Sequence, residues 1–263
     1  MNRFSIVAKQ NEKSLQAAEY LKGRLMQEHF YYTETDPEFI ITVGGDGTLL
    51  YAVHQYLKKL DHLYFIAVHT GTLGFYTDYG EDEIDECIQD ILNNNVYEIY
   101  TSSLLKGEVI SDHKIMRTVY ALNEVRIENI LTTQTLDVYI DDEYFETIKG
   151  NGICLSTQAG ATAYNRSLKG AVVDNGLQIM QMVEIAGLHH KNHNSLGVPY
   201  IMKNNRTVTF LLNHCKDTYL CFDHEELLLD DEIDQIRCMM SEKKVRFVRF
   251  RKYSYLKRLR NLY

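Results

Sequence analysis

Residues 39–57 read FIITVGGDGTLLYAVHQYL, an apolar run that breaks at glycines and continues with a different spacing of apolar side chains. The five residues 39–43 indicate a buried strand, and from Thr48 onward apolar residues return at the three- and four-residue intervals of a helix. A strand that passes through glycines into a helix is one repeat of a βα arrangement. This stretch therefore predicts a parallel sheet with helices packed on it.

The flanking sequence extends the same alternation over residues 1–95. Apolar runs at 4–8 and 63–68 predict strands, and helical spacing at 12–28 and 81–92 predicts helices. Beyond about residue 100 short apolar runs predict strands at 104–110, 115–122, 134–140, 144–148, 152–156, 206–212, 218–222 and 244–250. Asp141-Asp142 suggests a hairpin turn, and 175–186 has helical spacing.

We therefore expect an α/β plus all-β chain. Residues 1–100 would form an N-terminal α/β domain with a mostly parallel sheet, carrying the GGDGT loop. Residues 101–250 would form a C-terminal β-rich, dinucleotide-binding domain, and 251–263 a basic C-terminal tail.

Composition narrows the class of protein. The chain has 263 residues, of which 45% are hydrophobic and 24% charged, as in an ordinary globular protein. No apolar run reaches the ~20 residues that span a bilayer, and the start lacks the apolar stretch of a signal peptide. Five cysteines without a C-x-x-C pair fit a reducing compartment. We expect a soluble, cytoplasmic protein with no membrane partner.

The net charge of −8 is unevenly distributed. Residues 243–263 contain nine Lys or Arg and no acid, whereas the preceding residues hold 19 bases against 36 acids. An acidic body repels nucleic acid, so we expect no nucleic-acid partner. The basic end could be a nucleic-acid or membrane arm. We favour a terminal strand and helix that is docked on, or exchanged between, acidic subunits.

The glycine loop 44–47 has the features of a phosphate site with a carboxylate inside it. Backbone N–H groups at a helix start bind phosphate, and glycines allow close approach. The loop is neither G-x-G-x-x-G nor a P-loop, because no Lys follows it. Asp46 would repel phosphates, so it should hold Mg²⁺ or face a hydroxyl that must lose a proton. Both roles point to phosphoryl transfer to an alcohol. The alternative is a tight turn in which Asp46 caps the helix.

Two further segments could bind a planar ring and a sugar. Residues 150–167 read GNGICLSTQAGATAYNRS, and their small side chains would let a ring lie against backbone while Tyr164 stacks on it. Asn123-Glu124 ends an apolar run and could read ribose hydroxyls or a base edge. The alternatives are a plain loop and a strand-end cap.

The remaining polar clusters are weaker candidates. The histidines of 189–193 and Glu184 lack the further ligands of a zinc site, so no protein-held metal is predicted. Cys154 has apolar neighbours and should be a buried, inert thiol.

The three motifs, in this order and spacing, resemble the NAD kinases, in particular the short Gram-positive bacterial type. GGDGT alone is shared with lipid kinases, and TAYN at 162–165 is much more specific. The resemblance implies a kinase that phosphorylates the adenosine ribose 2′-hydroxyl of NAD with ATP, giving NADP. Mg²⁺ or another divalent cation would come with ATP. It also implies a homo-oligomer, with a tetramer favoured, in which a neighbouring subunit completes the nicotinamide site.

The resemblance also assigns residues. Asp46 would orient the 2′-hydroxyl and take its proton, and Gly45 and Gly47, with Gly44, would lie against phosphates. The adenosine half would be bound by Phe75, Asn123, Glu124, Thr162 and Ala163. Tyr164 would stack between the two halves, and Asn165 and Arg166 of the same motif would also bind NAD. The nicotinamide half would be bound by Lys149, Asn151, Ser167, Ala186, Asp223 and His224.

Three positions depart from the family pattern. Asn151 replaces the usual Asp, Gln158 the usual Pro and Ala159 the usual Ser or Thr. We expect these changes to affect NAD affinity rather than the chemistry. They leave open a non-catalytic dinucleotide-binding module. A lipid or sugar kinase that shares only the GGDGT loop is a second alternative. The donor, ATP or polyphosphate, and the preference for NAD or NADH also stay open.

Overall fold

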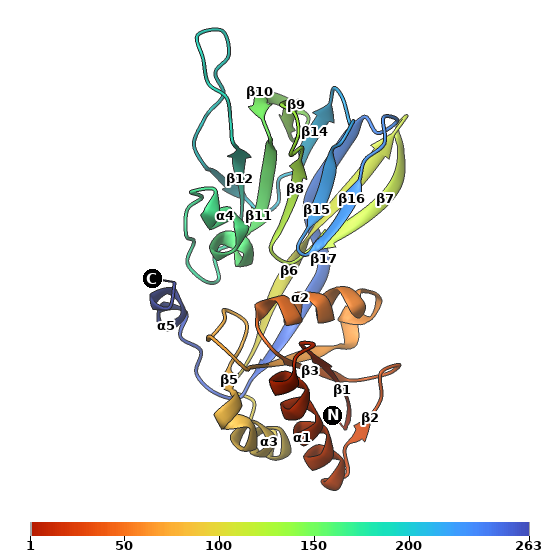
Figure 1. Ribbon diagram of the computed structural model, residues 1–263, viewed down its shortest axis with the longest axis vertical. Coiled ribbons are helices and arrows are strands. Elements are labelled where there is room, and N and C mark those ends of the chain that lie inside the picture. The colour runs from red at the N-terminus through yellow and green to blue at the C-terminus, as the bar shows by residue number, and fades with distance from the viewer. Residues whose placement is uncertain (1, 263) are drawn as a thin grey trace. The chain divides into compact units, whose positions relative to one another are not determined.

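The structure is a computed structural model that describes residues 2–262, shown in Figure 1. It separates into two compact units: the described residues up to Ser102 together with those from Lys243 on, and Ser103–Glu242. Strands β6 (Glu98–Ser111) and β17 (Gln235–Arg249) run from one unit into the other. The second break therefore falls inside β17, at residue 243, whereas the sequence-based boundary is at residue 250.

The first unit is built on a parallel sheet, as predicted. Its strands follow the order β2 (Tyr31–Tyr32), β1 (Arg3–Ala8), β3 (Phe39–Val43), β4 (Tyr64–His69). Strand β5 (Tyr79–Gly80) and the end of β17 both pair in parallel with β4. The helices are α1 (Glu12–Gln27), α2 (Asp46–Gln55), α3 (Ile84–Asn93) and α5 (Tyr255–Arg260), with 3₁₀ turns η1 (Leu57–His62) and η2 (Glu81–Glu83).

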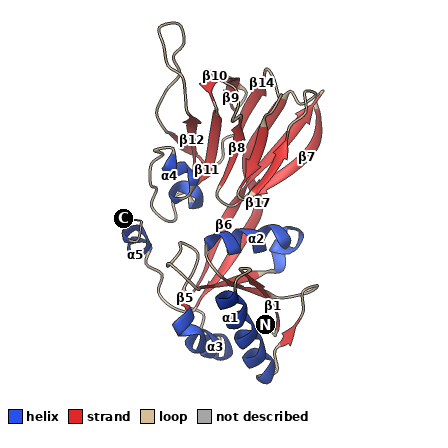
Figure 2. Cartoon of the chain, in the orientation of Figure 1, coloured by secondary structure: helices blue, strands red, loops and turns tan. Residues whose placement is uncertain are grey.

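The core of this unit explains the sequence pattern. Every residue of β3 is buried, because helices lie against the sheet, as Figure 2 shows. The apolar side chains of α1 and α3 meet those of the strands in one cluster that includes Leu21, Leu25, Phe39 and Ile88. The parallel strands thus read as continuous apolar runs rather than alternating ones.

The second unit is β-rich, as predicted. One sheet has the order β13 (Tyr200–Lys203), β12 (Ile179–Ile185), β11 (Gly152–Thr157), β8 (Glu124–Glu128), β15 (Tyr219–Phe222), β16 (Glu225–Leu228). The other strands are β7 (Lys114–Ala121), β9 (Gln134–Ile140), β10 (Glu143–Gly150) and β14 (Val208–Leu212). The short helical turns η3 (Ala159–Thr162) and α4 (Tyr164–Ser167) follow β11.

The helix expected over 175–186 is wrong. Residues 179–185 form strand β12, which pairs with β11 on one side and β13 on the other. Five of its seven residues are apolar, and a sixth, Gln181, is fully buried. A strand of this kind lacks the strict alternation of apolar and polar residues that would distinguish it from a helix in the sequence. The hairpin at Asp141-Asp142 is confirmed: both residues have positive φ, 51° and 66°, as a two-residue turn between β9 and β10 requires.

None of the helices described within residues 2–262 has the length and apolarity needed to cross a membrane.

Candidate functional site

Asp46 lies at the start of α2, directly after the buried strand β3. Gly44, between them, has φ +155°, and a Cβ there would lie 2.2 Å from Thr48 Oγ1, so the turn requires glycine. The N-cap of α2 is Gly45, without a side-chain cap. Asp46 is therefore the first helical residue and does not cap the helix through its carboxylate. The carboxylate is hydrogen-bonded to a different segment of the chain instead.

The carboxylate of Asp46 accepts two backbone hydrogen bonds from the loop after β4. Phe75 N donates to Oδ2 over 2.8 Å and Tyr76 N donates to Oδ1 over 3.1 Å. A Cβ on Gly74 would come within 2.2 Å of Oδ1, so the carboxylate lies against the bare backbone of that glycine. Two segments far apart in sequence thus fix its orientation.

Burial raises the pKa of Asp46, and this effect outweighs the two backbone hydrogen bonds and the nearby charges of Arg258 and His69, which lower it. A carboxylate with a raised pKa is a stronger proton acceptor than an exposed one. The arrangement therefore suits a general base that is held in one orientation.

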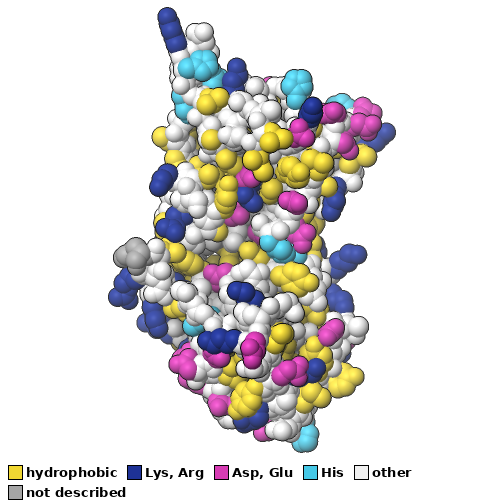
Figure 3. Space-filling model, viewed as in Figure 1, with side chains coloured by type: hydrophobic (Ala, Val, Ile, Leu, Met, Phe, Trp, Pro, Cys, Tyr) yellow, Lys and Arg dark blue, Asp and Glu magenta, His cyan; other side chains and the backbone are white. Residues whose placement is uncertain are grey.

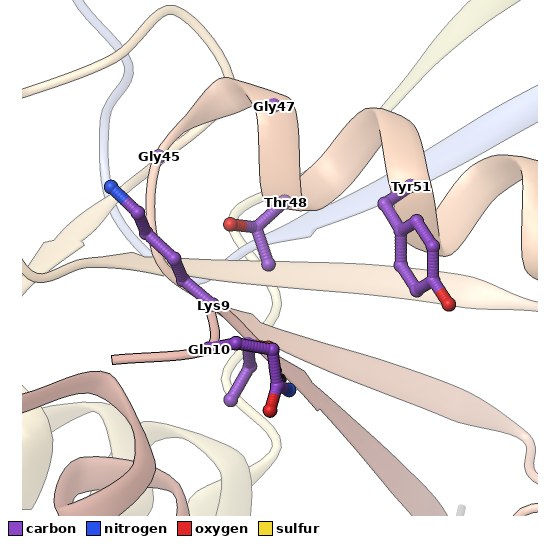
Figure 4. A pocket seen from close by; sticks show the side chains of 7 residues that line it. Lys9, Gln10, Gly45, Gly47, Thr48 and Tyr51 are labelled. Atoms are coloured by element: carbon purple, nitrogen blue, oxygen red, sulfur yellow. Dashed lines mark hydrogen bonds between the residues drawn. The ribbon is translucent and has the colours of Figure 1, made fainter. Parts of the chain in front are cut away.

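A cavity of about 560 Å³ opens beside the glycine loop, within the first unit. It is lined by Ala8, Lys9, Gln10, Gly45, Gly47, Thr48 and Tyr51. Figure 4 shows the Lys9 side chain extending toward Gly45, near the start of α2. Backbone N–H groups at a helix start and one ammonium group suit a phosphate-bearing ligand. Sequence reasoning missed Lys9, because nothing in its neighbours marks it; only the pairing of β1 with β3 brings it here.

The basic C-terminal segment docks on its own unit. Arg249 and Arg258 are buried and pair with Asp78 at 3.7 and 3.1 Å, and Arg251 pairs with Glu83 at 2.6 Å. Figure 3 shows basic side chains gathered around α5 on the face in view. The sequence left two alternatives for this segment, a docked terminal segment and a nucleic-acid or membrane arm. The contacts of these three arginines fit a docked segment.

In the second unit, Asp223 is brought to the start of β8. Its carboxylate oxygens accept from Leu122 N and Asn123 N, both over 2.7 Å. Thr157 N donates to Asn123 O over 2.8 Å, and a Cβ on Gly160 would lie 2.1 Å from the same oxygen. The motif segment that follows β11 is thus packed closely on Asn123. Two assignments 100 residues apart in sequence, Asn123 and Asp223, meet here.

A row of charges runs along one face of β8, on alternate residues. Glu124 and Glu128 flank Arg126, which lies 2.6 Å from Glu128 Oε1 and 4.0 Å from Glu124 Oε1. The guanidinium of Arg126 lies over the ring of Tyr164, 4.0 Å from its centroid. Sequence reasoning missed Arg126 and Glu128, although a charged residue at every second position of a strand was a usable signal.

Glu124 is a buried carboxyl group that has one unpaired oxygen among the described residues. In the part of the chain described, its Oε2 has no hydrogen-bond partner, although the side chain is only 6% exposed. Burial, aided by the nearby charge of Asp223, raises its pKa to about 8 from an ordinary 4.5. A buried oxygen without a partner is a candidate contact for a ligand hydroxyl.

We expect Glu124→Gln to change the pH dependence of stability. Between pH 4.5 and about 8 the unfolded chain ionises Glu124 while the folded protein keeps it protonated, so the wild type loses stability as pH rises. The Gln variant lacks this loss and gains in relative melting temperature from pH 5 to 8. The exposed Glu226→Gln serves as control. Parallel pH profiles for wild type and Glu124→Gln would contradict the assignment.

A second group lies at the other end of β11. Asn151 N donates to Ile185 O over 2.9 Å, next to Ala186, and Asn151 Nδ2 donates to Asn129 O over 2.8 Å. Lys149 and Asn129 line a cavity of about 620 Å³. An aspartate in place of Asn151 could not make the bond to Asn129, which gives a structural reason for the departure at this position.

The two groups of the second unit are joined by β11. Ser156 pairs with Glu124 and Gly152 with Glu128, so the groups are separated by on the order of 13 Å along the strand. That separation suits a ligand with two ends.

The other assigned residues fall into three environments. Thr162, Ala163 and Tyr164 are half-buried on the turns after β11, and Arg166, Ser167 and His224 are exposed. Asn165 is fully buried, and its amide nitrogen donates to Ala161 O and Ala171 O, while its Oδ1 has no hydrogen-bond partner among the described residues. The Phe75 ring, in the first unit, packs edge-on against Tyr255.

The remaining candidates are a metal site and the thiol of Cys154. Among residues 2–262 no group of three or more His, Cys, Asp or Glu could hold a metal ion. Burial raises the pKa of the Cys154 thiol well above its usual range, as expected of an inert, buried cysteine.

Comparison with known proteins gives consistent matches over the chain. The family model described as the ATP-NAD kinase N-terminal domain matches residues 4–96, and that of the ATP-NAD kinase C-terminal domain matches residues 122–250. NAD kinase of Geobacillus stearothermophilus is 35% identical over 260 residues, covering 98% of this chain and 95% of the relative. NAD kinase 1 of Bacillus subtilis is 33% identical over 259 residues, covering 98% and 97%.

Two solved structures share the fold. Yeast NADH kinase complexed with NADH matches with a TM-score of 0.84 at 18% identity, covering 100% of this chain and 87% of that one. An NAD kinase from Archaeoglobus fulgidus in complex with ATP matches with a TM-score of 0.75 at 21% identity, covering 99% and 96%.

Proposed function

Since this chain belongs to the NAD kinase family, we propose that it transfers the γ-phosphoryl group of ATP to the adenosine ribose 2′-hydroxyl of NAD, giving NADP and ADP. The observation that carries the proposal is the Asp46 carboxylate, which sits beside a phosphate-binding type of loop and is fixed by two backbone N–H groups. A dinucleotide-binding module without catalysis has no use for a carboxylate at that position.

In the proposed reaction Asp46 accepts the proton of the 2′-hydroxyl as the hydroxyl oxygen attacks the γ-phosphorus. The bond between the γ-phosphorus and the bridging oxygen breaks, and ADP leaves with the electron pair of that bond. Each Asp46 oxygen carries one hydrogen bond from the loop, which leaves a lone pair for the substrate hydroxyl. General-base help of this kind contributes ~10²–10⁴ in rate.

The phosphates of ATP are proposed to bind at Gly44, Gly45 and Gly47, with Lys9 adding one positive charge. A divalent cation such as Mg²⁺ would enter with ATP as part of the substrate. The free lone pairs of Asp46 are assigned to the substrate hydroxyl rather than to a resident metal ion.

The dinucleotide is proposed to bind through the two groups of the second unit. The spare oxygen of Glu124 would accept from a ribose hydroxyl at one end of β11, and Asn151 with Ala186 would lie near the nicotinamide half at the other. Between these ends Arg126, which pairs with Glu128, lies over the ring of Tyr164 and would hold that ring in place beside the ligand.

A homotetramer, a cytoplasmic location and use of polyphosphate as a second donor are further proposals from the family resemblance. The five cysteines are all free and buried, which supports a reducing compartment. A light-scattering mass decides the oligomeric state.

The test of the function is direct. Purified full-length protein with NAD and Mg-ATP is expected to form NADP, measured with an NADP-specific dehydrogenase, with polyphosphate and NADH in parallel reactions. Binding of NAD without formation of NADP from any donor would instead make the protein a binding module. Phosphorylation of a lipid or sugar in preference to NAD would favour the other rival.

A further inference from the structure

We propose that Tyr253 and Arg258 are positioning residues for the reaction: they hold the two peptide groups that orient the Asp46 carboxylate. This inference rests on the proposed function of Asp46. It assigns a catalytic task to the C-terminal segment, residues 253–258, which carries none of the family motifs described above.

The argument starts from two adjacent peptide groups. The peptide between Gly74 and Phe75 donates its N–H to Asp46 Oδ2, while its carbonyl accepts from Arg258 Nε over 3.1 Å. The peptide between Phe75 and Tyr76 donates its N–H to Asp46 Oδ1, while its carbonyl accepts from the Tyr253 hydroxyl over 2.9 Å. Each peptide group is thus hydrogen-bonded on one side to Asp46 and on the other to the C-terminal segment.

These hydrogen bonds can orient the N–H groups because a peptide group is planar. In a trans peptide the C=O and N–H bonds point in opposite directions within one rigid plane, so fixing the carbonyl also fixes the direction of the N–H. A hydrogen bond to the carbonyl also polarises the peptide and strengthens the bond that its N–H donates. Tyr253 and Arg258 therefore set both the direction and the strength of the two bonds on Asp46.

Arg258 is itself held firmly. It is only 5% exposed, and its Nη2 donates to Thr77 O and to Asp78 Oδ1, so it holds three residues of the same loop. Its guanidinium lies over the ring of Tyr253, 3.9 Å from the centroid, which ties the two positioning residues together. A buried arginine with this many loop contacts fixes geometry rather than binding solvent-exposed ligand.

The experiment compares Tyr253→Phe, Arg258→Gln and the control Arg260→Gln, which removes an exposed arginine from the same helix. We expect Tyr253→Phe to lower kcat roughly fivefold, as for the loss of one hydrogen bond, and Arg258→Gln to lower kcat at least ~10-fold. KM for NAD and for ATP should stay near wild type in both, because neither residue is proposed to touch a substrate. Arg260→Gln should match the wild type.

The pH profile separates positioning from simple structural support. Of the two charges that act on Asp46, Arg258 and His69, only Arg258 changes here. Removing Arg258 also frees the carbonyl of the Gly74–Phe75 peptide, which weakens the hydrogen bond from Phe75 N to Asp46. The pKa of Asp46 therefore rises, and the acid limb of kcat moves to higher pH in Arg258→Gln. A merely structural residue would lower the melting temperature without moving this limb.

Unchanged kcat in folded Tyr253→Phe, or a lower kcat in Arg258→Gln with an unmoved acid limb, overturns the inference. If Arg258→Gln does not fold, Tyr253→Phe alone decides, because it removes a single oxygen atom. An inactive wild-type enzyme would instead be a failure of the proposed function.

Discussion

Replacing Asp46 with asparagine should lower kcat for NADP formation by at least ~10², because the amide cannot take the proton of the 2′-hydroxyl. The structure adds a second reason. Both carboxylate oxygens accept from backbone N–H groups, whereas an asparagine has one acceptor oxygen and would turn an NH₂ toward Phe75 N or Tyr76 N. The side chain would therefore lose its fixed orientation as well as its basicity.

The measurement is steady-state kcat and KM, with dinucleotide binding followed by calorimetry. Binding should stay nearly intact, since Asp46 is assigned to the reacting hydroxyl and to no other contact. Equal activity in Asp46→Asn would reduce Asp46 to a turn residue at the start of α2, and would remove the basis of the proposed mechanism.

Substituting Gly74 with alanine should be almost as damaging to catalysis, although Gly74 itself has no side chain to react. The new Cβ would lie 2.2 Å from Asp46 Oδ1 and 2.6 Å from Cγ, closer than atoms can approach. The carboxylate must then move, because it is the end of a flexible side chain while Gly74 is backbone. A displacement of about 1 Å at a reacting group can cost ~10² in rate, so we expect a loss of that order in kcat.

The matched control is Gly71→Ala in the same loop, where a Cβ would meet nothing within 4 Å. Gly71→Ala should keep wild-type kcat, and Gly74→Ala should keep a near-wild-type melting temperature, because the clash is relieved by one side chain. Wild-type kcat in Gly74→Ala would show that the orientation of Asp46 is unimportant. A large loss of stability would show that the backbone, not the carboxylate, gives way.

Local sequence predicted the elements whose patterns are local. The run through residues 39–57 predicted a buried strand, a glycine turn and a helix, and the structure has all three. Asp46 could be selected as a candidate because a glycine loop depends on nearby backbone geometry, whereas Asn123-Glu124 was assigned by the resemblance to the family. Strand β12 could not be separated from a helix, because its burial comes from two neighbouring strands that are distant in sequence.

The sequence by itself determined the fold class and the family, because each depends on short-range periodicity or on motifs in a fixed order, and it supplied the proposed site residues. Only the tertiary structure decided what holds those residues. The partners of Asp46 come from residues 74–76, and the groups that hold those partners come from Tyr253 and Arg258, about 180 residues further along the chain. Such contacts result from the order of the strands and the docking of helices. The residues around any one position do not show them, because the partners are distant in sequence.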